Sequence, residues 1–264
     1  MRVFDSRHQL REEHRLTARV RSGRSEPFDA GNLLDRITPR STRELHDQRV
    51  RAREQQVLAR RLRRSGGDVV SVGCGWNPGR HLFPAPEWRL LGIDSDPDRV
   101  AGVMSSGRAD EARVGVAGAL GLPPASFDVV LYRLVLHHIA YQGPLGPCFR
   151  EAADALRPGG ALVAVEPGLW HPVGLGLALA NRVGAATAIH GTPDDVPLSP
   201  RVLVDEALTA GLVPELHALT YTWRRLPVAA QHASEPLDRL GSRPRAARFG
   251  HTLMLIARRP SDGG

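Results

Sequence analysis

An apolar run that ends in glycines is the first stretch of this sequence whose residue types could do chemistry. Positions 69–79 read Val-Val-Ser-Val-Gly-Cys-Gly-Trp-Asn-Pro-Gly. Because glycine turns freely and has no side chain, the backbone there can approach a ligand closely. Nicotinamide, flavin and nucleotide-derived cofactors all use such a turn between a strand and a helix, and a simple tight turn has the same composition. The stretch therefore indicates a cofactor-binding turn without identifying the cofactor.

An aspartate at the end of the next apolar run narrows the choice of cofactor. Asp94 follows the run 90–93 and lies 19 positions after Gly75. A carboxylate at this place can accept hydrogen bonds from both hydroxyls of a ribose, which favours a cofactor with an unphosphorylated ribose. The sequence Asp94-Ser95-Asp96-Pro97 can also cap a helix, and both roles can hold together.

Two histidines and a glutamate are the candidate catalytic residues. His137 and His138 follow an apolar run, so one ring should point into the protein and its neighbour elsewhere. His138 is the candidate general base, with a buried, hydrogen-bonded histidine as the alternative. Glu166 ends the apolar run 161–165, where open α/β sheets bind ligands, and it could orient a substrate or cap the next turn.

Short apolar runs alternate with helical stretches from residue 68 onward, which predicts an α/β fold with a parallel sheet. Ser41 and Glu44 form a capping box that predicts a helix through Leu62, with Gly66-Gly67 to end it. Further helices are expected over 147–157 and 199–211. The expected strands are 69–72, 90–93, 112–116, 129–131, 161–165, 216–222 and 252–257.

Five motifs follow one another along the chain, namely Val-Gly-Cys-Gly (72–75), Gly-Ile-Asp (92–94), Leu-Pro (122–123) before Phe-Asp-Val-Val (127–130), Leu-His-His-Ile (136–139) and Leu-Arg-Pro-Gly-Gly (156–160). In this order and spacing they resemble the motifs of class I S-adenosylmethionine-dependent methyltransferases. The resemblance covers residues 41–260, with a cofactor half (68–166) and a substrate-side half (167–260). It implies a Rossmann-like, doubly wound sheet of seven strands, mostly parallel with an antiparallel last strand, and S-adenosyl-L-methionine as the cofactor.

The resemblance implies roles for residues near the methionine part of the cofactor. Gly73 and Gly75 would let the backbone pass under it. Arg133 would offer its backbone carbonyl to the methionine amino group, and His138 would face the cavity near the methyl group. Arginines at the start of the long helix, Arg43 and Arg49, could reach the methionine carboxylate, although a solvated surface charge is the alternative.

At the adenosine end of the cofactor, the resemblance implies that Asp94 holds the ribose and that Ser95 borders the adenine. The family commonly has an acidic residue where this sequence has Ser71, and often an aspartate that binds the adenine amino group where it has Gly118. Both changes remove charge-assisted hydrogen bonds. Ala119 could still donate its backbone amide to the adenine, and Leu120 could pack on the ring. The losses leave open a catalytically inactive binding or scaffold subunit with this fold.

The acceptor is expected to be a small, partly apolar metabolite methylated at oxygen, nitrogen or carbon. The Leu-His-His pattern is similar to the branch that methylates small molecules, and no Asn-Pro-Pro-Tyr or Asp-Pro-Pro-Tyr motif follows the fourth expected strand. Closely spaced carboxylates that would hold a metal are also missing from the pattern. Trp170 and His171 are candidate pocket residues, with ordinary core packing as the alternative.

Charge is distributed unevenly. Residues 1–66 hold 17 arginines and 9 acidic residues, whereas residues 67–264 hold 18 and 19. Residues 1–40 are expected to form a basic, loosely ordered or helical lead-in. A basic arm could dock an RNA or a protein substrate, which is the alternative function, but Phe4 and Phe28 are its only base-stacking aromatic residues.

Several classes of protein are disfavoured by the composition. The sequence contains no run of about 18 apolar residues that could span a membrane. Its first thirty residues are charged throughout, and two cysteines are too few for a disulfide scaffold. The expected location is the cytoplasm, and the pattern gives no indication of an oligomeric state.

Overall fold

The computed structural model describes residues 38–62, 64–183, 197–239 and 243–261. The expected lead-in over residues 1–40 lies almost entirely outside these ranges. In the described ranges no helix is long and apolar enough to cross a membrane. The strands are β1 (Gly67–Val72), β2 (Trp88–Asp94), β3 (Glu111–Val114), β4 (Phe127–Arg133), β5 (Leu156–Pro167), β6 (Val213–Thr220) and β7 (Thr252–Arg258). The helices are α3 (Arg40–Arg61), α4 (Pro97–Ser105), α5 (Leu136–Gln142), α6 (Gly146–Ala155), α7 (Pro172–Arg182), α9 (Pro200–Thr209), α10 (Val228–Asp238) and α11 (Pro244–Ala247).

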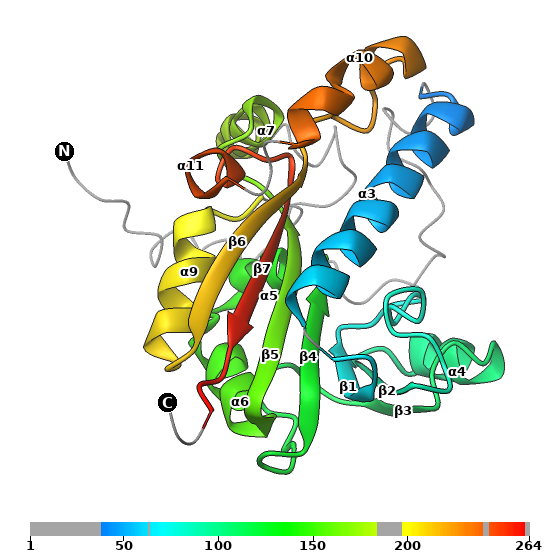
Figure 1. Cartoon of the computed structure of the whole chain (residues 1–264), viewed down its shortest axis with the longest axis vertical. Helices are drawn as coiled ribbons and strands as arrows, with labels where there is room; N and C mark the ends of the chain where they lie inside the picture. Colours follow the sequence, from blue (N-terminus) through cyan, green and yellow to red (C-terminus); the bar gives the residue numbers. More distant parts are fainter. Residues whose placement is uncertain (1–37, 63, 184–196, 240–242, 262–264) are drawn as a thin grey trace.

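The strands form one seven-stranded sheet in the order β3-β2-β1-β4-β5-β7-β6 (Figure 1). The pairs among β1 to β5 are parallel, and β7 runs antiparallel between β5 and β6. This arrangement confirms the predicted fold class, and each expected strand overlaps one of the seven observed strands. Val72 pairs with Ile93 on one side and with Tyr132 on the other. The carboxyl ends of β1, β2 and β4 therefore meet at one edge of the sheet.

Alternate residues of each strand face opposite sides of the sheet and build two cores. Val70 and Val72 belong to the core that includes Phe149 of α6 and Leu203 of α9. Val69 belongs to the other core, which α3 and α4 cover. Figure 1 shows α3 crossing one face of the sheet, with α6 and α9 on the opposite side. The long apolar runs of the sequence reflect this burial on both faces.

The start of α3 differs from the predicted capping box. The helix begins at Arg40, because the carbonyl of Pro39 accepts hydrogen bonds from the backbone amides of Thr42 and Arg43. Glu44 therefore lies inside the helix and forms an ion pair with Arg40 at 2.7 Å, instead of capping its first turn. The helix ends at Arg61, before the two glycines that were expected to end it.

Candidate functional site

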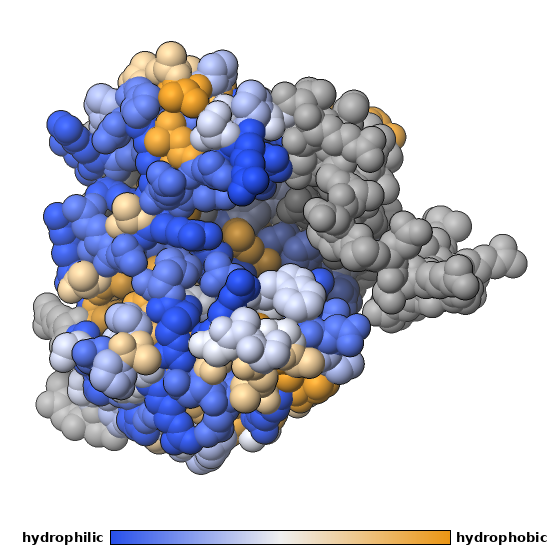
Figure 2. Space-filling view, turned by 90° about the vertical axis from the view of Figure 1, so that its right-hand side faces the viewer, coloured by the Kyte–Doolittle hydropathy of each residue, from blue (hydrophilic) through white to orange (hydrophobic). Residues whose placement is uncertain are grey.

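A cleft of about 660 Å³ opens at the carboxyl ends of β1, β2 and β4. Ligands of open α/β sheets bind at this edge, where the strand order reverses. Figure 2 looks onto the side that carries α3 and α4, and it shows a mostly hydrophilic surface with a hollow at mid-height. The cleft is lined by six of the residues predicted from the sequence, namely Gly73, Gly75, Asp94, Ser95, Arg133 and His138.

The glycine turn after β1 forms one wall of the cleft. Gly73 has a φ of +63°, and a Cβ atom there would lie 2.3 Å from Cγ2 of Val135. Both the backbone conformation and the close contact with Val135 disfavour any larger residue at this position. The backbone N–H of Gly75 donates to Oδ2 of Asp94 at 2.8 Å, which ties the turn to the end of β2.

Asp94 is buried and lines the cleft. Besides the bond from Gly75, its Oδ1 accepts the N–H of Asp96 at 3.0 Å and lies 3.9 Å from Arg99. A carboxylate offers about four acceptor positions, so two remain for hydroxyl groups of a ligand. The helix-capping role belongs to Asp96 instead, whose side chain accepts the N–H of Asp98 at the start of α4.

A glutamate that sequence reasoning missed shapes the loop after β3. Glu151 lies on α6, about thirty residues further along the chain, and no local signal connects it to the loop. Its carboxylate accepts three backbone N–H groups, from Gly118 at 3.1 Å, Leu120 at 2.6 Å and Gly121 at 2.9 Å. Charge-assisted bonds of this kind are stronger than neutral ones, so Glu151 fixes the loop conformation.

This loop places two of the predicted cofactor residues away from the cleft lining. The N–H of Ala119 donates to the carbonyl of Val116 at 3.1 Å, and the N–H of Leu120 is taken by Glu151. The side chain of Leu120 packs in the core, whereas Ala117 lines the cleft. Ala119 and Leu120 are thus not among the residues that line the cleft, and their contacts with an adenine remain a prediction.

An ion pair between Arg133 and Glu54 lies at the end of β4, where Arg133 lines the cleft. Arg133 donates through Nε to Oε1 of Glu54 at 2.9 Å and through Nη2 to Oε2 at 3.3 Å. Glu54 lies on α3, is fully buried, and also contacts Nε2 of His81 at 3.3 Å. Burial raises the pKa of Glu54, but the hydrogen bond from His81 and the charge of Arg133 outweigh it and hold the pKa below its ordinary value. Neither Glu54 nor His81 was predicted from the sequence.

The other predicted catalytic residue, Glu166, lies behind the cleft wall. Its Oε1 accepts the N–H groups of Val135 at 3.0 Å and Leu136 at 2.8 Å, and its Oε2 lies 2.5 Å from Nδ1 of His137. Both Glu166 and His137 are buried. His138 lines the cleft, with its ring centroid 4.0 Å from that of His137. The structure thus separates the two adjacent histidines as expected and makes Glu166 the anchor of the turn into α5.

The two candidate pocket residues after β5 have different surroundings. Trp170 is 45% exposed. His171 is buried, with Nε2 3.1 Å from the carbonyl oxygen of Tyr221, and its Nδ1 accepts the N–H of Val173. Burial lowers the pKa of His171 despite the bond to Tyr221. Both ring nitrogens of His171 are therefore occupied by the backbone.

Both cysteines are present at the cleft as neutral thiols. Burial, with the charge of Asp94, raises the pKa of Cys74 to about 12. Burial and the charge of Glu151 raise the pKa of Cys148 to about 11. A thiol with such a pKa is a poor nucleophile at neutral pH, so the two side chains contribute surface and packing to the cleft.

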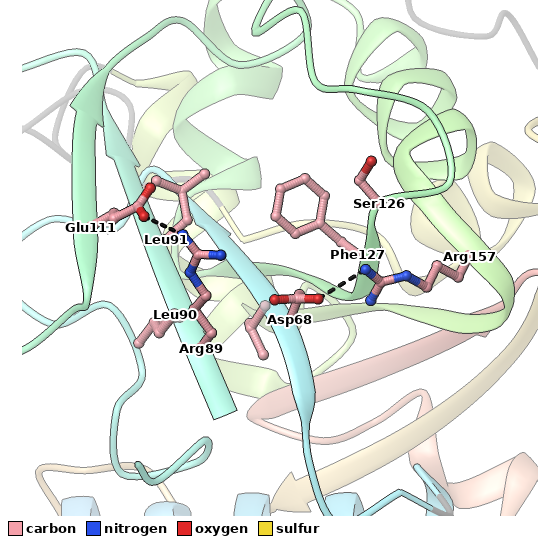
Figure 3. A pocket seen from close by; sticks show the side chains of 9 residues that line it. Asp68, Arg89, Leu90, Leu91, Glu111, Ser126, Phe127 and Arg157 are labelled. Atoms are coloured by element: carbon pink, nitrogen blue, oxygen red, sulfur yellow. Dashed lines mark hydrogen bonds and ion pairs between the residues drawn. The ribbon is translucent and has the colours of Figure 1, made fainter. Parts of the chain in front are cut away.

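A second, smaller cavity of about 270 Å³ lies at the opposite edge of the sheet, at the amino ends of the strands (Figure 3). Arg157 forms an ion pair with Asp68 at 2.9 Å, and Arg89 pairs with Glu111. Phe127 points between these two pairs. The four charged groups balance one another, and this edge is not where such sheets bind ligands.

Comparisons with known proteins agree with this geometry. Residues 70–164 match a family model described as a methyltransferase domain. A Mycolicibacterium smegmatis protein named "Probable S-adenosylmethionine-dependent methyltransferase" is 36% identical over 118 residues, which are 44% of each chain. The present chain therefore matches less than half of that relative's length.

Solved structures share the fold at low sequence identity. A chain of the structure described as "Complex between the Haloferax volcanii Trm112 methyltransferase activator and the putative methyltransferase" has a TM-score of 0.57 at 19% identity, over 84% of this chain and 94% of that one. Haemonchus contortus phosphoethanolamine N-methyltransferase 2, solved with S-adenosyl-L-methionine, has a TM-score of 0.53 at 15% identity, over 79% and 52%.

Proposed function

We propose that this chain, whose residues 70–164 form a class I S-adenosylmethionine-dependent methyltransferase domain, methylates oxygen, nitrogen or carbon of a small, partly apolar metabolite. The observation that carries the proposal is the buried Asp94 carboxylate. It lies at the carboxyl end of β2, beside the glycine turn, and keeps acceptor positions for a ribose.

The lining of the cleft fits the parts of S-adenosyl-L-methionine. Asp94 lies between a neutral wall, formed by Ala117, Pro147 and Cys148, and the charged side chain of Arg133. The neutral wall suits an uncharged adenine, and the glycine turn leaves room for the chain that joins adenosine to the methionine part. When bound, S-adenosyl-L-methionine supplies an electrophilic methyl group on its sulfonium, and the product is S-adenosyl-L-homocysteine.

The acceptor side of the proposal depends on His138 and on exposed apolar side chains. His138 lines the cleft, and its proposed role is to take a proton from an oxygen or nitrogen nucleophile. Leu134, which also lines the cleft, is 44% exposed, and the apolar side chains of Val135 and Ile139 belong to the same lining. Apolar surface at the mouth of a cleft favours an acceptor with an apolar part.

Calorimetric titration of the protein with S-adenosyl-L-methionine and with S-adenosyl-L-homocysteine tests the cofactor assignment. Asp94→Ala should weaken both affinities about tenfold or more, because hydrogen bonds to a charged group contribute about 1.5–3 kcal/mol. The matched control is Asp98→Ala on the exposed first turn of α4, which should bind like the wild type.

Unchanged affinity in Asp94→Ala would overturn the ribose assignment. Failure of the wild type to bind either ligand would favour the scaffold alternative, in which Ser71 and Gly118 have cost the cleft its cofactor. Once binding is established, transfer of a radiolabelled methyl group to a panel of small acceptors tests the substrate class. Transfer only to RNA or protein would contradict it.

A further inference from the structure

Arg133 lines the cleft, and its positively charged side chain forms an ion pair with Glu54 of α3. Two of its nitrogens, Nε and Nη2, donate to the two oxygens of Glu54. Within the described ranges the third nitrogen, Nη1, has no hydrogen-bond partner, and it is not one of the enclosed polar atoms. Because a guanidinium is a rigid planar fork, fixing one edge on Glu54 directs the remaining donors away from it.

Glu54 is suited to fix this orientation. It is 0% exposed, and it is tied to His81 as well as to Arg133. Its own helix, α3, is anchored to the core by Val50, Val57 and Leu58. The ion pair therefore joins a rigid helix to the end of β4, and Arg133 is held in one position before any ligand arrives.

The charges along the cleft distinguish its two ends. At the β2 end, Arg99 lies near the carboxylates of Asp94 and Asp96, which balance it. At the β4 end, Arg133 has donors left over. With the ribose on Asp94, S-adenosyl-L-methionine can place only one charged end in the cleft, its α-amino and α-carboxylate groups. A guanidinium edge complements a carboxylate.

We propose that Nη1 of Arg133 binds the α-carboxylate of S-adenosyl-L-methionine, and that Glu54 is the positioning residue that aims it. This inference rests on the proposed function and adds a role for the side chain of Arg133. The backbone carbonyl of the same residue remains available for the α-amino group. The site consequently selects a cofactor that carries a free carboxylate.

Decarboxylated S-adenosylmethionine tests the assignment, because it differs from S-adenosyl-L-methionine only in lacking the carboxylate. Calorimetry should show that the wild type prefers S-adenosyl-L-methionine by about tenfold or more, the range of a charge-assisted pair. Arg133→Met should lose this preference by weakening only the binding of S-adenosyl-L-methionine. Asp94→Ala should weaken both ligands and keep the preference.

Two further variants separate the proposed role from a structural one. Arg133→Lys keeps the charge but not the fork, so it should retain part of the preference. Glu54→Gln should reduce the preference while thermal melting shows a folded protein. An equal loss for both ligands in Arg133→Met, or an unchanged preference, would overturn the inference while the cofactor assignment stands. A wild type that binds neither ligand would overturn both.

Discussion

At the scale of single residues, the cleft is organised by buried and half-buried carboxylates that accept several hydrogen bonds each. Asp94, Glu151 and Glu166 hold backbone N–H groups of three different loops, and Glu54 holds the side chains of Arg133 and His81. Asp94, Glu151 and Glu166 each stabilise a loop whose conformation is not determined by the loop's own sequence. These bonds give the loops around the cleft one defined shape.

Glu166→Gln should change the tautomer of His137 without abolishing the fold. The amide oxygen can still accept the N–H groups of Val135 and Leu136, but the amide NH₂ then faces Nδ1 of His137. Nδ1 must become an acceptor, and its proton moves to Nε2. Nitrogen NMR of the histidine ring should report this exchange.

Urea denaturation should also show a loss of about 1–3 kcal/mol in the free energy of unfolding of Glu166→Gln, because its buried hydrogen bonds to a charged group are weakened. The matched control is Glu87→Gln, an exposed residue before β2, which should change stability by less than about 0.5 kcal/mol. An unaltered His137 signal in Glu166→Gln would show that another group fixes the tautomer.

At the scale of elements, three histidines connect parts of the chain that are far apart in sequence. His46 lies on α3, His171 precedes α7, and His251 precedes β7. The ring of His251 meets those of His46 and His171 edge to face, at centroid distances of 5.8 and 5.1 Å. Burial, together with the charges of His171, His46 and Arg224, lowers the pKa of His251 to about 3.

Acidification should destabilise the protein through His251. Its pKa is lowered in the folded state from the ordinary value of 6.5, so the unfolded chain binds more protons between pH 3 and 6.5. The contribution of His251 to the free energy of unfolding is fully present above pH 6.5. It decreases as the pH falls and is about 2 kcal/mol smaller at pH 5. Chemical denaturation at pH 7.5 and 5.0 measures the difference.

His251→Gln should lose most of this pH dependence, whatever its effect on absolute stability. His232→Gln is the control, because its imidazole lies on the exposed side of α10. If the pH dependence of His251→Gln equals that of the wild type, other groups cause the acid destabilisation.

At the scale of the whole molecule, the sheet has two unlike edges. The carboxyl edge carries the large cleft and the spare donors of Arg133, whereas the amino edge carries a small cavity with balanced ion pairs (Figure 3). The net charge of +7 belongs to the whole chain, and its excess lies in residues 1–66. Binding of small ligands in the cleft therefore need not depend on the positive excess of residues 1–66.

Methyl transfer to a small acceptor should depend weakly on salt. We expect kcat/KM to change less than about threefold between 50 and 200 mM salt, because few counterions are released. A nucleic acid bound through 6–10 phosphate contacts would instead lose about 10³–10⁵ in affinity over the same range. Steady-state assays at four salt concentrations distinguish the two, and a steep fall would favour a macromolecular substrate.

Local sequence patterns are enough to predict the strands, the glycine turn and the aspartate at the end of β2. Apolar runs predict buried strands from local periodicity, and Gly73 has a left-handed backbone conformation that favours glycine and lies against Val135. Asp94 could be predicted because its spacing from the turn is set by the single segment that joins the parallel neighbours β1 and β2. These signals are local, so they survive without knowledge of the tertiary contacts.

The contacts between polar groups that are distant in sequence follow from the tertiary structure alone. Glu54 and Arg133 are 79 residues apart, Leu120 and Glu151 are 31 apart, and His137 and Glu166 are 29 apart. The pairing of charges over such separations follows from strand order and helix packing, and one sequence offers many arginines and carboxylates that could pair. The same reason explains the shift of Ala119 and Leu120 from the cleft, because a carboxylate from another helix takes the backbone of their loop.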